Sequence, residues 1–80
     1  MSPNEMKLRV ILSQLLGTPL EAISDETSNE TVESWDSVKQ LNIVLTLEEQ
    51  FGISFDEQVA LEIVSVPLIR TALIDCGISF

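Results

Sequence analysis

The sequence predicts an all-α protein, a four-helix bundle with a long first loop and a short third helix. Three observations lead to this fold class. Apolar residues recur at helical spacing, every glycine falls just past a predicted helix end, and no segment shows the alternation typical of a strand. The chain has 80 residues, of which 45% are hydrophobic, so we assign residues 1–80 to one folded domain.

The first helix is predicted over residues 3–16. Ser2 is placed to cap it, Pro3 takes its first position, and Glu5 stands where a capping box has its glutamate. Gly17 supplies a left-handed stop. One apolar stripe runs along the helix and consists of Leu8, Ile11, Leu12 and Leu15.

Residues 17–35 are predicted to form a loop, because they are rich in Ser, Thr, Asp and Asn and have no sustained apolar period. A loop of this length is unusual in a compact domain and is often functional. We expect four apolar side chains to hold it on the core, namely Leu20, Ile23, Val32 and Trp35.

The second helix is predicted over residues 37–50, before the stop at Gly52. Its apolar arc is wider than half the circle and contains Val38, Leu41, Ile43, Val44, Leu45 and Leu47. So broad an arc predicts a central helix that contacts several neighbours.

Two further helices are predicted over residues 56–63 and 66–76. Acidic residues open the third helix, where the helix dipole favours them, and Ser65 caps the fourth. The apolar face of the fourth helix consists of Leu68, Ile69, Ala72, Leu73 and Cys76. We therefore interpret Cys76 as a small buried hydrophobe and not as a nucleophile.

Composition excludes several classes of function. Thirteen acidic residues against four basic ones give a formal charge of −9, which argues against nucleic-acid binding and against docking on anionic lipid, and favours a partner protein with a basic patch. Without histidine, the chain can form neither a Ser-His-Asp triad nor a His-ligated metal site, so we do not expect an enzyme. One cysteine, no signal peptide and no apolar run long enough to span a membrane predict a cytoplasmic protein, which we expect to be a monomer.

The most informative segment is Asp36-Ser37-Val38, where the long loop meets the second helix. A hydroxyl at a helix N-terminus is well placed to carry a phosphodiester, because the first backbone N–H groups and the helix dipole favour an anion there. The alternative is an ordinary N-cap, and Gln40 would complete a Ser-x-x-Gln capping box with Ser37. The two interpretations are compatible.

The segment Asp36-Ser37-Val38, followed by Leu41, Val44, Leu45 and the run Leu47-Glu48-Glu49-Gln50-Phe51-Gly52-Ile53, resembles the acyl carrier proteins. The resemblance covers nearly the whole chain and includes the long loop and the acidic third helix. It implies that a phosphopantetheinyl transferase attaches 4′-phosphopantetheine to Ser37, and that Asp36 and Val38 belong to the motif which the transferase recognises. The arm carries acyl groups as thioesters, and the helical core can shelter them.

The resemblance also implies partners, namely an acyl-loading ligase or transferase and synthase enzymes with basic patches. The acidic residues that match the partner-binding positions of the family are Glu48, Glu49, Glu57 and Glu62. Fatty acid, polyketide or related specialised biosynthesis is the implied setting. A solvated face that keeps the domain soluble is the alternative interpretation of these acids.

The chain departs from the family pattern around the motif. Val38 replaces a leucine, Trp35 replaces a glycine, and Lys39 and Asn42 stand where the fatty-acid carriers have acids. The start of the second helix is therefore less anionic than usual, which favours a dedicated carrier for a specialised pathway. For Trp35 we expect packing on the core in preference to contact with thioester or partner.

Three alternatives remain open. D-alanyl and peptidyl or aminoacyl carriers share the serine and the fold, and an unmodified acidic helical interaction domain would also explain the charge. A calcium-binding loop starting at Asp25 has oxygen ligands at nearly the right spacing, but Glu30 stands where the loop needs glycine and Asp36 where it needs glutamate.

Overall fold

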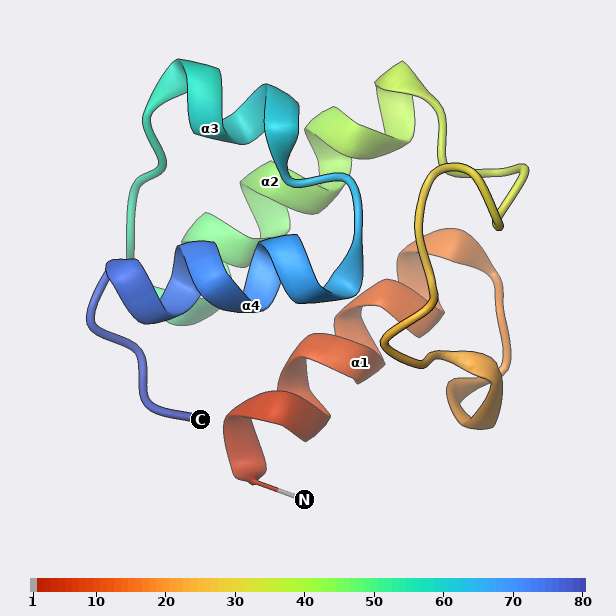
Figure 1. Cartoon of the computed structure of the whole chain (residues 1–80), viewed down its shortest axis with the longest axis horizontal. Helices are drawn as coiled ribbons and strands as arrows, with labels where there is room; N and C mark the ends of the chain where they lie inside the picture. Colours follow the sequence, from red (N-terminus) through yellow and green to blue (C-terminus); the bar gives the residue numbers. More distant parts are fainter. Residues whose placement is uncertain (1) are drawn as a thin grey trace.

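The computed structural model describes residues 2–80, and its regular secondary structure over that range is helical, apart from one isolated bridge pair (Figure 1). Its elements are α1 (Pro3–Leu16), a 3-10 turn η1 (Leu20–Ala22), α2 (Ser37–Phe51), α3 (Glu57–Glu62) and α4 (Val66–Asp75). The all-α fold with a long first loop and a short third helix is therefore confirmed. Each helix end lies within one residue of its predicted position.

Local signals in the sequence determine where the helices begin and end. The Ser2 hydroxyl accepts a hydrogen bond from Glu5 N at 3.1 Å, as a cap of α1 should. Gly17 and Gly52 close α1 and α2 with φ of 68° and 65°, a left-handed conformation that other residues adopt only with strain. The Glu5 carboxylate does not complete the capping box, because it is paired with Arg9 and Arg70 instead.

The core lies between α1, α2 and α4, and the long loop closes one side of it. The buried hydrophobic cluster consists of Leu8, Ile11, Leu12, Leu16, Ile23, Trp35, Ile43, Val44, Leu47, Ile63, Val66, Ile69, Ala72 and Leu73. Ile23 and Trp35 hold the loop on the core as predicted, and Val32 packs against the cluster in part. The prediction for Leu20 is wrong: its side chain is exposed on η1, where the loop turns away from the core.

Helix α2 buries only part of its apolar arc. Val38, Leu41 and Leu45 are 69%, 59% and 55% exposed, and they form a row on the outer side of the helix. Only the other side of the arc, at Ile43, Val44 and Leu47, faces the core. We call Val38, Leu41 and Leu45 the α2 apolar row. Exposed leucines and valines grouped on one helix face are typical of a surface that contacts a partner.

Cys76 is exposed, which contradicts its predicted burial. Helix α4 ends at Asp75, so Cys76 is its C-cap residue and lies beyond the turns that pack on the core. The buried face of α4 consists of Val66, Ile69, Ala72 and Leu73.

The long loop is also fixed to the connection between α3 and α4. Asn29 N donates to Val64 O at 3.0 Å and Val66 N donates to Thr27 O at 3.1 Å, on either side of the antiparallel bridge between Ser28 and Ser65. These bonds hold the middle of the loop beside the connection between α3 and α4.

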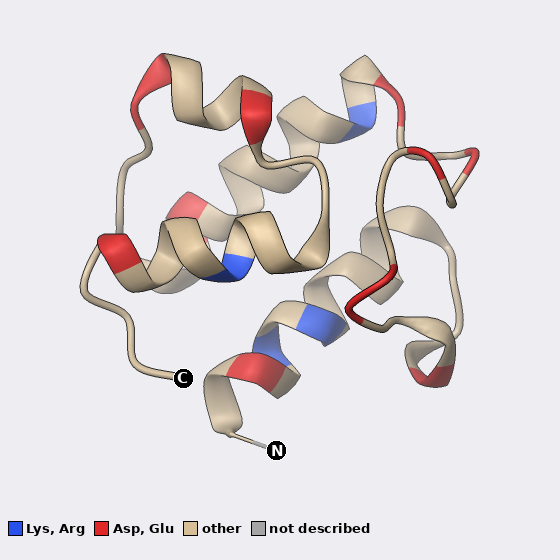
Figure 2. Cartoon of the chain, in the orientation of Figure 1, with Lys and Arg blue, Asp and Glu red and all other residues tan. Residues whose placement is uncertain are grey.

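Charged residues are distributed unevenly (Figure 2). Acidic residues follow the long loop and mark both ends of α3, whereas basic residues lie on α1, near the start of α2 and on α4. Three of the four cations make contacts within the protein: Arg9 and Arg70 pair with Glu5 and Asp25, and Lys7 donates to Gln50 O at the end of α2. Much of the acidic surface therefore has no basic neighbour from the chain itself.

In residues 2–80, no helix has the length and apolarity needed to cross a membrane.

Candidate functional site

Ser37 is the first residue of α2, and its side chain is exposed. Asp36, not Ser37, is the N-cap of the helix: its Oδ1 accepts a hydrogen bond from Lys39 N at 2.8 Å. The predicted capping box between Ser37 and Gln40 is therefore wrong. Because another residue caps the helix, the Ser37 hydroxyl is available for chemistry.

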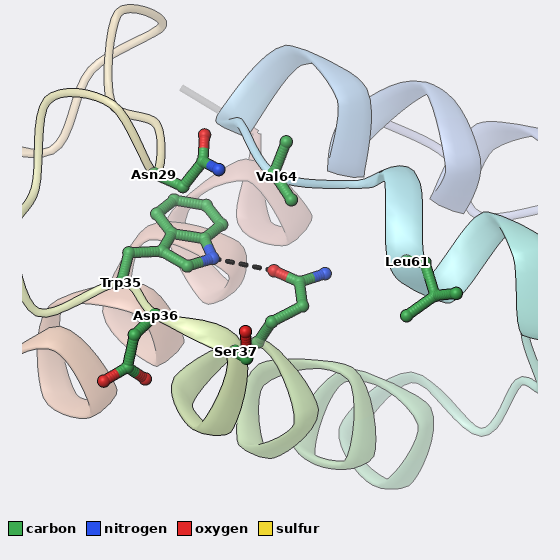
Figure 3. A pocket seen from close by; sticks show the side chains of 7 residues that line it. Asn29, Trp35, Asp36, Ser37, Leu61 and Val64 are labelled. Atoms are coloured by element: carbon green, nitrogen blue, oxygen red, sulfur yellow. Dashed lines mark hydrogen bonds between the residues drawn. The ribbon is translucent and has the colours of Figure 1, made fainter.

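A surface cavity of about 390 Å³ lies beside Ser37 (Figure 3). Figure 3 shows the Ser37 side chain directed toward this cavity and the Asp36 carboxylate directed away from it. Polar and apolar side chains both line the cavity: Asn29, Trp35, Asp36, Ser37, Gln40, Leu61 and Val64. The long loop, the start of α2 and the end of α3 thus meet at the hydroxyl.

Sequence reasoning missed the function of Gln40. Its side chain is buried and accepts a hydrogen bond from the Trp35 indole N–H at 2.7 Å. Its amide nitrogen donates to Ala60 O at 2.8 Å and to Ile63 O at 3.2 Å. The partners lie 20 and 23 residues away in the chain, so no local pattern in the sequence could have indicated them.

The arrangement around Ser37 fits a phosphopantetheine group. The first N–H groups of a helix have no partner within the helix, and the dipole of the 15-residue α2 places partial positive charge at its start. A phosphodiester on Ser37 would therefore meet favourable electrostatics. The exposed hydroxyl and the adjoining cavity leave room for the attached arm.

Asp36 has a structural function that can be tested separately from any motif function. We expect Asp36→Ala to lower the free energy of unfolding by about 1 kcal/mol, because the Lys39 N–H loses its partner. Asp36→Asn keeps an oxygen that can cap, and it should change the stability by less than about 0.5 kcal/mol. Urea unfolding of both variants measures the difference. Equal losses in the two variants would show that charge, and not capping, is what Asp36 contributes.

The four acidic residues predicted to bind partners lie in different surroundings. Glu49, Glu57 and Glu62 are exposed, although Glu62 accepts a hydrogen bond from Gln58. Glu48 is half-buried, and its Oε2 accepts a hydrogen bond from Phe55 N at 2.8 Å. The Glu48 carboxylate therefore stabilises the connection between α2 and α3.

This difference predicts unequal effects of two neighbouring substitutions. Glu48→Ala should lower the free energy of unfolding by about 1.5 kcal/mol, since a charged acceptor of a backbone N–H is lost. The matched control Glu49→Ala changes an exposed residue and should stay within about 0.5 kcal/mol of the wild type. Denaturant unfolding at pH 7 gives both values. A loss in the control as large as that in Glu48→Ala would contradict a structural function specific to Glu48.

The loop that resembled a calcium site has other contacts. Asp25, its first ligand, bonds Arg70 at 2.6 Å and Arg9 at 3.3 Å. In the part of the chain that the structure describes, no group of three or more His, Cys, Asp or Glu side chains is placed to hold a metal ion. The ion pairs of Asp25 thus account for the position of this acid without calcium.

Comparison with known proteins gives the family of this helical protein. The model of the phosphopantetheine attachment site family matches residues 7–71, so the chain belongs to this family of carrier proteins. A curated relative is acyl carrier protein 3 of Ralstonia nicotianae, which is 37% identical over 51 residues. That match covers 64% of this chain and 59% of the relative. The resemblance to acyl carrier proteins and the predicted cofactor, 4′-phosphopantetheine, are thereby confirmed.

Proposed function

We propose that residues 1–80 form one acyl carrier domain and that Ser37 is its attachment residue. One observation carries the proposal: an exposed serine hydroxyl occupies the first position of α2 beside a cavity, while Asp36 caps the helix. The protein is then the substrate of its partner enzymes and not itself a catalyst. Fatty acid, polyketide or related biosynthesis is the setting that this function implies.

Attachment requires a transferase, magnesium and coenzyme A. The Ser37 oxygen attacks the phosphorus that bears the pantetheine unit, a new O–P bond forms, and the bond to the departing adenosine bisphosphate breaks. The hydroxyl proton passes to a base of the transferase. By its match to the family motif, Asp36 assists the metal-dependent step on the transferase. The attached group supplies a thiol that carries the acyl cargo as a thioester.

Two surface features support recognition by enzymes with basic patches. The α2 apolar row begins directly after Ser37 and offers three exposed aliphatic side chains. Glu49 at the end of α2 and Glu57 and Glu62 at the ends of α3 add exposed negative charge. Apolar contact combined with opposite charge gives both affinity and steering. We expect the carrier to be monomeric and cytoplasmic.

We further propose a dedicated carrier for a specialised pathway. Lys39 and Asn42 make the start of α2 less anionic than in the fatty-acid carriers which the chain resembles. Supplying the loaded protein to fatty acid synthase enzymes tests this proposal: little or no turnover is expected, and efficient turnover would contradict it. A separate loading assay distinguishes D-alanyl and peptidyl or aminoacyl cargo by which loading enzyme accepts the protein.

The experiment for the main proposal is an intact-mass measurement. The wild-type protein is incubated with coenzyme A, magnesium and a promiscuous phosphopantetheinyl transferase, and the product is then fragmented to locate the modification. We expect one added phosphopantetheinyl group, located on Ser37. No addition with several transferases would favour the unmodified interaction domain, and addition at another residue would overturn the assignment of Ser37.

A further inference from the structure

Trp35 and Gln40 form a buried hydrogen-bonded pair directly behind Ser37. Gln40 follows Ser37 by one turn of α2 and is 8% exposed, and the Trp35 ring is 3% exposed. Through Gln40 the pair reaches the carbonyl oxygens of Ala60, within α3, and of Ile63, its C-cap. One amide side chain thus joins the long loop, α2 and the end of α3.

The pair lies at the boundary between the cavity beside Ser37 and the buried core. Both side chains line the cavity beside Ser37, and Trp35 also belongs to the buried core cluster (Figure 3). Opening a path past Gln40 would deprive the buried indole N–H and the Ile63 carbonyl of this partner, and the partly buried Ala60 carbonyl as well, which is unfavourable.

Helix α3 depends on these bonds. It has six residues, none of which is buried, so packing alone holds it weakly. A mobile α3 would let cargo pass between the helices. The two bonds from Gln40 oppose this movement at the end of α3 nearest Ser37.

We propose that Trp35 and Gln40 close the helical core to the cargo, so that acyl groups carried on Ser37 stay outside it. The inference rests on the proposed function of Ser37, and it replaces the expectation that the core shelters the acyl chain. It makes Trp35 and Gln40 specificity-determining residues. The substrate class is short or polar acyl groups, because a long alkyl chain would remain in water. The cavity lining combines polar residues, such as Asn29 and Ser37, with the apolar residues Leu61 and Val64, which suits such a group at the surface.

The test compares forms of the wild-type protein whose phosphopantetheine arm carries no acyl group, a butyryl group or an octanoyl group. A promiscuous transferase is used with coenzyme A, butyryl-coenzyme A and octanoyl-coenzyme A, and intact mass verifies each product. The readouts are the melting temperature and the NMR signal of the Trp35 indole N–H, which is the only indole in the chain. We expect melting temperatures within about 2 °C of one another and an unchanged indole signal, since no methylene group is buried.

Chain burial would give a different result. Four additional buried methylene groups should raise the melting temperature by about 10 °C or more and shift the indole signal. That outcome in the wild type would overturn the inference while leaving the proposed function intact. If none of the three coenzyme A forms gives an attached arm, the proposed function is overturned and the inference with it.

The variant Gln40→Ala tests whether this residue is the barrier. Its octanoyl form should melt higher than its butyryl form, whereas the exposed control Gln14→Ala should behave as the wild type. If Gln40→Ala folds and its butyryl and octanoyl forms have the same melting temperature, the assigned function of Gln40 is contradicted. Should this variant not fold, the wild-type series alone decides.

Discussion

Ser37→Ala is expected to abolish the attachment of phosphopantetheine completely and to leave the fold unchanged. Alanine has no oxygen that can attack phosphorus, and no neighbouring hydroxyl occupies the start of α2. The N-cap bond belongs to Asp36, so the substitution removes no bond of the cap. Alanine is also a good helix former. We therefore expect the free energy of unfolding to change by less than about 0.5 kcal/mol.

The control for this variant is Ser54→Ala. Ser54 is also exposed, but it lies between α2 and α3 and not at a helix start, so its loss should leave the added mass unchanged. Intact mass measures attachment, and circular dichroism with urea unfolding measures the fold. Full modification of a folded Ser37→Ala variant would show that the attachment residue lies elsewhere.

The helices could be predicted from the sequence because their ends depend on residues close together in the chain. Ser2 and Pro3 begin α1, and Gly17 and Gly52 end α1 and α2 in the left-handed conformation. Each of these signals acts within one helical turn. The position of Ser37 at the start of α2 could be predicted for the same reason.

The choice between Asp36 and Ser37 as the cap could not be made from the sequence. Both residue types are good N-caps, and the path of the backbone, which the tertiary fold sets, decides between them. The exposure of Leu41 and Leu45 was missed for a related reason. A helical projection shows that apolar residues share an arc, but it does not show which part of the arc meets another helix. Pairing over long separations, as between Gln40 and Ile63, leaves no local signal at all.

The ion-pair cluster of Glu5, Arg9, Asp25 and Arg70 is the longest-range of these features, because Glu5 and Arg70 lie 65 residues apart. Arg70 holds the Glu5 carboxylate with two bonds of 2.7 and 2.9 Å, and Arg9 adds one of 2.7 Å. These contacts join α1 to α4, and Asp25 adds the long loop through Arg70 and Arg9. The Glu5 side chain is only 12% exposed, so water screens the cluster weakly.

Glu5→Gln should therefore destabilise the protein by about 2–3 kcal/mol at pH 7, a large effect for so small a domain. Glutamine keeps the size of the side chain but leaves Arg9 and Arg70 with Asp25 as their one acidic partner in the cluster. The exposed substitution Glu30→Gln is the matched control and should change stability by less than about 0.5 kcal/mol. Urea unfolding of the three proteins gives the values. A loss no greater than that of the control would show that the cluster contributes nothing to stability.

The same substitution predicts a pH dependence of known sign. Hydrogen bonds from Arg70, and then from Arg9, lower the pKa of Glu5 from 4.5 to about 2 against the opposing effect of burial. A carboxyl whose pKa is lowered by folding contributes its full stabilisation above its unfolded pKa and loses it as pH falls toward the folded pKa. The stability difference between wild type and Glu5→Gln should hence be constant above about pH 5 and shrink steadily toward pH 2. Other carboxyl groups titrate in this range too, but they are common to both proteins and largely cancel in the difference. A difference that stayed constant down to pH 2 would mean that the stabilisation does not depend on the charge of Glu5.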